Sequence, residues 1–106
     1  MMPVRSPIRY DVIGSAALRS LPLLVLRWLP DGRREGHEWV SRNPTRADRH
    51  LGSFKINLRT GQWADFATGD KGGDVISLAA YLHGLSQSVA AGKVAHMLGL
   101  TTEQDS

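Results

Sequence analysis

The clearest pattern along the chain is a strict alternation of apolar and polar positions over residues 52–58. Such alternation is typical of a strand with one buried face. A turn at residues 59–61 reverses the chain, so residues 62–66 are expected to return as the second strand of a hairpin. The apolar face of the first strand consists of Phe54, Ile56 and Leu58.

The part of the chain before the hairpin predicts one helix and two strands. Residues 8–18 could form a short helix. Residues 21–30 are rich in Leu and Val and favour a strand, which ends at the turn signal Asp31-Gly32. Residues 36–42 look like the antiparallel partner of that strand.

The pattern changes to helical spacing after a glycine-rich loop at residues 67–73. Asp74 is a good N-cap for a helix that stops at Gly84, and Ser86 can cap a second helix that stops at Gly99. The sequence therefore predicts an α+β fold, in which a small antiparallel sheet of about four to five strands is followed by two short C-terminal helices.

The length of 106 residues fits a single domain. Residues 1–7 contain two prolines and no periodicity, so we expect a flexible leader there. Residues 8–100 are expected to form one domain, and residues 101–106 a disordered tail.

The composition excludes several classes of protein. The chain has no cysteine, so disulfides, thiolate metal sites and a cysteine nucleophile are ruled out. The longest apolar stretch, residues 21–26, is far shorter than the roughly 20 residues that span a bilayer. No membrane partner is expected, and a cytoplasmic location is the default.

No arrangement typical of catalysis is present, since an enzyme needs an activated nucleophile, paired carboxylates or a metal. Three carboxylates, Asp65, Asp70 and Asp74, lie close enough in sequence to hold magnesium. Simpler roles as strand residue, turn residue and helix cap explain them better. The four histidines show no ligand-like spacing. We therefore expect a non-catalytic protein without a cofactor.

Charge is distributed unevenly along the chain. The formal net charge is +3, and residues 27–59 include eight basic residues but only four acidic ones. Guanidinium groups bind phosphate in a bidentate manner, so a local arginine excess favours a polyanionic partner. An ordinary solvated surface is the other interpretation. The basic residues are Arg27, Arg33, Arg34, Arg42, Arg46, Arg49, Lys55 and Arg59.

Four motifs follow one another in the chain: Asn43-Pro44-Thr45-Arg46, Ser53-Phe54-Lys55-Ile56-Asn57, Trp63-Ala64-Asp65-Phe66-Ala67-Thr68-Gly69 and Gly72-Gly73-Asp74-Val75-Ile76. In this order they resemble the zinc-ribbon nucleic-acid-binding domain of bacterial and phage DNA primases and primase-helicases. The resemblance covers residues 36–98. That family carries Cys-Pro-x-His at the first motif and Cys-x-x-Cys at the third, and these residues bind zinc.

All four zinc-ligand positions are changed in this chain, which holds Asn43, Arg46, Asp65 and Thr68 there. The resemblance therefore implies a ribbon without zinc, because none of these residues is a thiolate or an imidazole. A structural zinc contributes folding free energy. Either an Asp65–Arg46 ion pair replaces it, with hydrogen bonds from the other two positions, or a larger core makes it unnecessary. The four vestigial positions are expected to converge in space.

The hairpin is where nucleic acid could be bound. If a three-residue loop pairs Leu58 with Gln62, Trp63 shares an open face with Lys55, Asn57 and Asp65. A base could then stack on the indole beside a cation. A one-residue change in loop length would place Trp63 in the core instead. With the three-residue loop, the packed face holds Phe54, Ile56 and Phe66.

These observations favour a non-catalytic module that binds nucleic acid, with single-stranded DNA as the expected partner, in replication or in the maintenance of a phage or another mobile element. Any priming activity would come from a partner such as a primase, polymerase or helicase protein, or from a longer parent chain. The alternative is a protein-interaction module that docks on a replication or mobile-element protein. The glycine-rich loop with Lys71 touches a phosphate in the first interpretation, or is only a structural turn. The candidate contacts are Arg33, Arg34, Arg42, Arg46, Arg49, Lys55, Arg59, Trp63 and Lys71.

Overall fold

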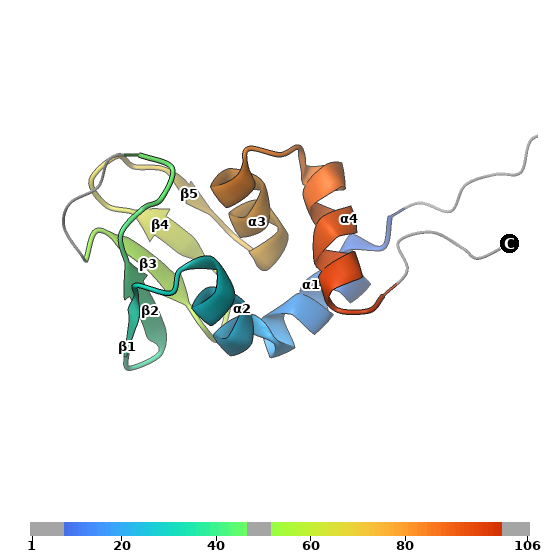
Figure 1. The fold of residues 1–106 in the computed structure, drawn as a ribbon, viewed down its shortest axis with the longest axis horizontal. Coiled ribbons are helices and arrows are strands. Elements are labelled where there is room, and N and C mark those ends of the chain that lie inside the picture. The colour runs from blue at the N-terminus through green and yellow to red at the C-terminus, as the bar shows by residue number, and fades with distance from the viewer. Residues whose placement is uncertain (1–7, 47–51, 101–106) are drawn as a thin grey trace, which may run out of the picture.

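Two helices precede an antiparallel sheet of five strands, and two more helices follow it (Figure 1). The computed structural model describes residues 8–46 and 52–100, so the expected leader and tail lie outside the described residues. The α+β fold class is confirmed. The elements are α1 (Tyr10–Arg19), α2 (Leu21–Trp28), β1 (Arg33–Glu35), β2 (Glu38–Ser41), β3 (Phe54–Asn57), β4 (Trp63–Asp65), β5 (Lys71–Gly72), α3 (Val75–His83) and α4 (Gln87–Met97).

The strands lie in the sheet in the same order as in the chain, and each pairs with the next in antiparallel fashion. The register places Trp39, Ile56 and Trp63 opposite one another on three neighbouring strands. All three side chains are buried. Because side chains alternate between the two faces of a strand, this row defines the packed face of the sheet, which the helices cover.

The prediction of a strand at residues 21–30 is wrong, because Leu21–Trp28 is helix α2. Its buried residues Leu21, Leu24 and Val25 follow helical spacing, and Leu29 continues the same face. Pro22 lies in the first turn of the helix, where its missing N–H costs no hydrogen bond. A short apolar run does not distinguish a strand from a buried helix by its periodicity, which is why the sequence misled here.

The loss of that strand changes the partners of its predicted neighbour. The strand expected at residues 36–42 does form, as β2, but it pairs with β1 and β3. The glycine-rich loop at residues 67–73 also contains an unexpected edge strand, β5, which pairs with β4. The sheet therefore gains a strand at each edge that the pattern of the sequence did not reveal.

The two C-terminal helices confirm the predicted caps. The Asp74 carboxylate accepts a hydrogen bond from the Ser77 N–H at 2.7 Å, and the Ser77 hydroxyl accepts one from the Asp74 N–H at 3.4 Å. Gly84 ends α3 in the left-handed conformation at φ +65°. Ser86 caps α4 through the Val89 N–H.

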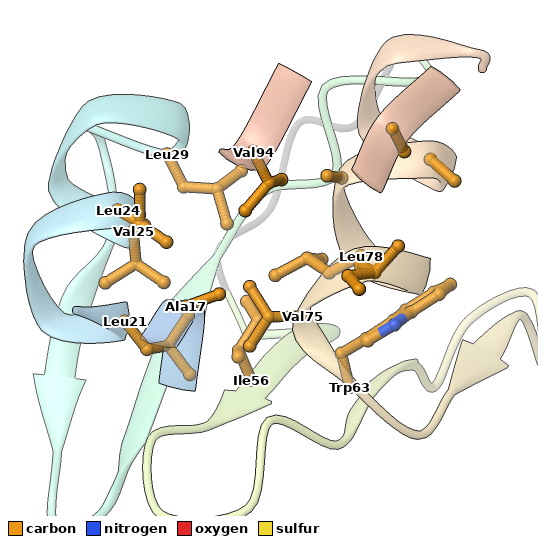
Figure 2. Close-up of a cluster of buried hydrophobic side chains, with 14 of the residues drawn as sticks. Ala17, Leu21, Leu24, Val25, Leu29, Ile56, Trp63, Val75, Leu78 and Val94 are labelled. Atoms are coloured by element: carbon orange, nitrogen blue, oxygen red, sulfur yellow. The ribbon is translucent and has the colours of Figure 1, made fainter. Parts of the chain in front are cut away.

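One hydrophobic core joins the packed face of the sheet to all four helices. Figure 2 shows Val75 and Leu78 of α3 between the α1–α2 residues and Trp63 of the sheet, and Val94 of α4 pointing toward Leu29. Within the described ranges, no helix is both long enough and apolar enough to span a lipid bilayer.

Steric crowding explains why the first residue of the Gly72-Gly73-Asp74 motif is a glycine. A Cβ atom on Gly72 would lie 2.5 Å from the Trp63 Nε1 and 2.5 Å from the Ser77 Oγ, far inside van der Waals contact. The indole of Trp63 thus lies directly against the backbone of β5 and donates a hydrogen bond to Ser77 at 2.9 Å. Gly73 has open space around the corresponding position.

Gly72→Ala is therefore expected to lower the free energy of unfolding by about 1–3 kcal/mol, as overpacked sites do. The matched control is Gly73→Ala, which introduces the same methyl group without a clash. Urea denaturation of both variants measures the difference. Equal stability of the two variants would contradict the steric explanation.

Candidate nucleic-acid interface

The hairpin between β3 and β4 has a loop of four residues, so the predicted three-residue loop is wrong. The Asn57 N–H donates to the Gln62 carbonyl at 2.7 Å, which makes this pair the last one of the ladder. The Asn57 side chain accepts hydrogen bonds from the Arg59 and Thr60 N–H groups at 2.8 and 3.1 Å. Gly61 completes the loop at φ +80°.

The additional loop residue moves Trp63 of β4 and Phe66, just after β4, to the faces of the sheet opposite to those predicted. Trp63, expected on the open face, lies on the packed face and is only 6% exposed. It is not accessible for base stacking, and neither is the buried Trp39. Phe66, expected on the packed face, is 70% exposed.

The open face of the sheet carries a row of cations in register across all five strands. Arg33 pairs with Val40, Val40 with Lys55, Lys55 with Ala64, and Ala64 with Lys71. The basic residues therefore occupy β1, β3 and β5. Val40, between Arg33 and Lys55, is only 1% exposed, so this face is covered at β2 and Arg33 is separated from the two lysines. Strands are about 4.8 Å apart, so successive cations of the row start from backbones separated by roughly 10 Å.

Phe66 lies beside this row. The Lys55 Nζ lies 5.8 Å from the centroid of the Phe66 ring, which is within cation–π distance. Phe66 and both lysines line a shallow depression of about 290 Å³ on the open face. Asn57 and Gln62 add amide groups to its wall. The depression thus combines one exposed ring, two ammonium groups and two amides, and we call it the Phe66 platform.

Acidic residues limit the positive potential at one end of the open face. Arg33 Nε donates to the Glu35 carboxylate at 2.7 Å, and both side chains are exposed. Glu38 also borders the Phe66 platform. Any phosphate bound on this face would therefore depend most on Lys55 and Lys71.

The other predicted contacts are scattered. Arg42 directly follows β2 and is exposed, and Arg59 is exposed in the hairpin loop. Arg34 pairs with Trp39, so it lies on the opposite side of the edge strand, where it donates to the Gly36 carbonyl at 3.0 Å. Arg49 lies outside the described residues.

Arg46, predicted to contact nucleic acid, instead makes an internal ion pair. Its Nε and Nη2 donate to the two carboxylate oxygens of Asp65 at 2.9 and 3.3 Å. Asn43 donates to the same carboxylate at 2.8 Å. Asp65 and Asn43 are buried, whereas the Arg46 side chain is 31% exposed. Three of the four positions that correspond to zinc ligands in the primase resemblance therefore converge through their side chains.

The fourth position, Thr68, takes part only through its backbone. Its N–H donates to the Asp65 carbonyl at 3.3 Å, while its hydroxyl accepts from the Asp70 N–H. A residue that the sequence analysis did not anticipate, Tyr81 of α3, also joins this group of hydrogen bonds. Its hydroxyl accepts from Asn43 at 2.7 Å and donates to Asp70 at 2.7 Å. We call Asn43, Arg46, Asp65, Asp70 and Tyr81 the Asp65 cluster.

The Asp65 cluster keeps its central carboxylate ionised. Burial on its own would raise the pKa of Asp65. Hydrogen bonds from Arg46, Asn43 and the Ala67 N–H, together with the charge of Arg46, outweigh burial and lower the pKa to about 2.

Each of the three aspartates considered for magnesium has another role, as partner of Arg46, acceptor for Tyr81 and cap of α3. Within residues 8–46 and 52–100, no group of three potential ligands among His, Cys, Asp and Glu lies close enough together to hold a metal ion.

Comparison with known proteins does not indicate a function for this chain. No model of a known protein family matches the chain, and no curated protein matches its sequence.

Sequence reasoning missed Phe66 and Tyr81. The signal for Phe66 was available, because Asn57 and Gly61 are typical of a tight loop that starts one residue earlier than the predicted one. Tyr81 falls at helical spacing from Leu78, and its local pattern does not distinguish it from an ordinary core position. Its ring packs at a tilt against Trp63, with 4.6 Å between centroids and 35° between planes, so only its hydroxyl departs from an ordinary core role.

Proposed function

We propose that the open face of the sheet binds single-stranded DNA, and that the chain is a non-catalytic module. The observation that carries this proposal is the pair Lys55 and Lys71, in register two strands apart, with the exposed Phe66 beside it. A strand laid across the sheet could place successive phosphates on these cations and one base on the ring. Base stacking on an aromatic side chain contributes about 1–3 kcal/mol.

The resemblance to the primase ribbon supports DNA as the ligand and the cytoplasm as the place of action. In that family the ribbon engages single-stranded template beside a separate polymerising domain. Catalysis would accordingly come from a partner such as a primase, polymerase or helicase protein, or from a longer parent chain. The role would be to hold the template near that active site during replication of the chromosome, a phage or another mobile element.

Phe66→Ala is expected to weaken binding of a fluorescein-labelled single-stranded oligonucleotide by a factor of about 5–150, which corresponds to the stacking energy of one base. Fluorescence anisotropy measures the dissociation constant. Leu23→Ala removes an equally accessible apolar side chain from α2 and serves as the matched control.

The same titration at two salt concentrations tests the electrostatic half of the proposal, because counterions are released when phosphates are neutralised. Affinity should fall steeply as salt rises. No binding at low salt, or binding that is indifferent to Phe66→Ala, would refute the proposed function. Preference for an RNA oligonucleotide of the same sequence would refute DNA as the ligand.

A further inference from the structure

A second candidate surface lies on the helices rather than on the open face of the sheet. A groove of about 980 Å³ runs between α2, α3 and α4. Trp28 and Arg27 at the end of α2 form one wall, and α4 forms the other. None of the residues of the Phe66 platform lines it.

The interior of the groove is mainly apolar. Trp28, Leu85 and Val94 line it, and Trp28 is held by an edge-to-face contact with His83 at 5.9 Å between ring centroids. Two further lining residues of α4, Val89 and Met97, are 48% and 37% exposed. Large apolar side chains that stay exposed around a concavity are typical of an interaction site.

The apolar surface continues along α2 beyond the groove. Leu23 lies one helical turn before Arg27, on the same side of the helix, and is 72% exposed. The surface is therefore longer than the groove itself, and this favours an extended occupant over a compact small molecule.

The basic residues around the groove indicate what kind of partner would fit it. The rim of the groove carries Arg27 and Lys93, together with His83 and His96. All three helices that form the groove lie within the described residues, and none of them contains Asp or Glu. An occupant with carboxylates beside an apolar stripe would match this rim.

We propose that the groove docks an amphipathic helix of a partner protein, whose apolar stripe fills the groove and whose flanks carry Asp or Glu. Helix-in-groove recognition uses apolar anchors at spacings of three and four residues, which suits a channel formed by other helices. A lipid surface fits less well, because the apolar side chains line a hollow rather than a protruding face. The platform for DNA stays open, so both partners could be bound at once.

The test uses the full chain and two labelled peptides of about 16 residues, long enough for roughly 24 Å of helix. Both carry leucines at i, i+3, i+4 and i+7, with Glu on the flanks of one peptide and Lys on the flanks of the other. Anisotropy is expected to show binding of the Glu peptide and at least tenfold weaker binding of the Lys peptide.

Two variants separate the parts of the proposal. Val89→Asp should weaken the Glu peptide at least tenfold, since it puts a charge on the apolar wall. Arg27→Glu/Lys93→Glu should reverse the preference, so that the Lys peptide binds better. The control Lys55→Glu/Lys71→Glu makes the same change in net charge on the open face of the sheet and should leave peptide binding unaltered. Circular dichroism confirms that each variant is folded.

Failure of the Glu peptide to bind, or equal binding of both peptides, would overturn the proposal. So would a dimer, detected by sedimentation, that Val89→Asp dissociates, because a second copy would then be the occupant. Binding to vesicles of phosphatidylcholine and phosphatidylserine that is lost in Val89→Asp, with no peptide binding, would likewise overturn it in favour of a membrane surface.

Discussion

Asp65→Ala is expected to lower the melting temperature by about 10–20 °C, the largest effect of any single substitution considered. The change leaves the buried Asn43 amide and the Arg46 guanidinium without their shared acceptor. Breaking a buried ion pair costs about 3–5 kcal/mol. Arg46 is partly exposed and can turn to water, so about 2–4 kcal/mol is reasonable, at roughly 5 °C per kcal/mol for a domain of this size.

The same variant should change the response to acid. The pKa of Asp65 lies at about 2 in the folded chain, below the ordinary value of 3.8. A carboxyl with a lowered pKa contributes stability that is complete above its ordinary pKa and is lost as pH falls through the folded value. The unchanged protein should therefore lose stability between pH 4 and pH 2, and Asp65→Ala should lack this part of the loss.

Thermal unfolding followed by circular dichroism at several pH values checks both expectations. Asp31→Ala, at an exposed position in the turn after α2, is the matched control for removal of a carboxylate. A melting temperature that is unchanged in Asp65→Ala would mean that the core formed by the helices stabilises the fold without help from the Asp65 cluster.

Lys55→Glu/Lys71→Glu is expected to weaken the binding of single-stranded DNA by about two orders of magnitude at low salt, with two phosphate contacts replaced by repulsion. It should also reduce the dependence of log affinity on log salt by about 0.7 per lost contact, or roughly 1.4 in total. Both lysines line the Phe66 platform, whereas the other basic residues are scattered or paired.

Arg27→Glu/Lys93→Glu makes an equal change in net charge on the helical side of the molecule. Anisotropy titrations of the two double variants should differ sharply, with DNA binding close to that of the unchanged protein in the second. Equal losses in both would indicate a general effect of net charge and contradict the assignment of the DNA contact to the open face.

Local signals decided which elements were predictable. The C-terminal helices were found because Asp74, Gly84 and Ser86 mark their ends with chemistry that needs no tertiary context. The hairpin strands were found because Phe54 and Ile56 alternate with polar residues. Helix α2 was missed because its apolar residues surround the helix on more than one side, which hides the period: Leu23 and Leu26 are exposed although Leu24 and Val25 are buried.

The candidate sites depended on finer detail than periodicity provides. The exchange of Trp63 and Phe66 between faces followed from one residue of loop length, an error that reverses every side chain beyond it. The meeting of Asn43, Arg46 and Asp65 was anticipated from the primase resemblance rather than from any spacing rule. Tyr81 joins them from α3, and the contact depends on how that helix lies on the sheet, which no local pattern encodes.

The Asp65 cluster has a consequence for how the protein is made. The positive charge opposite the carboxylate is Arg46, a covalent part of the chain, and its other hydrogen-bond donors are the Asn43 side chain and the Ala67 N–H. The contacts of this cluster therefore need no metal ion and no thiol that oxidants could damage. The contacts of the Asp65 cluster would therefore persist where zinc is depleted or the redox balance is disturbed.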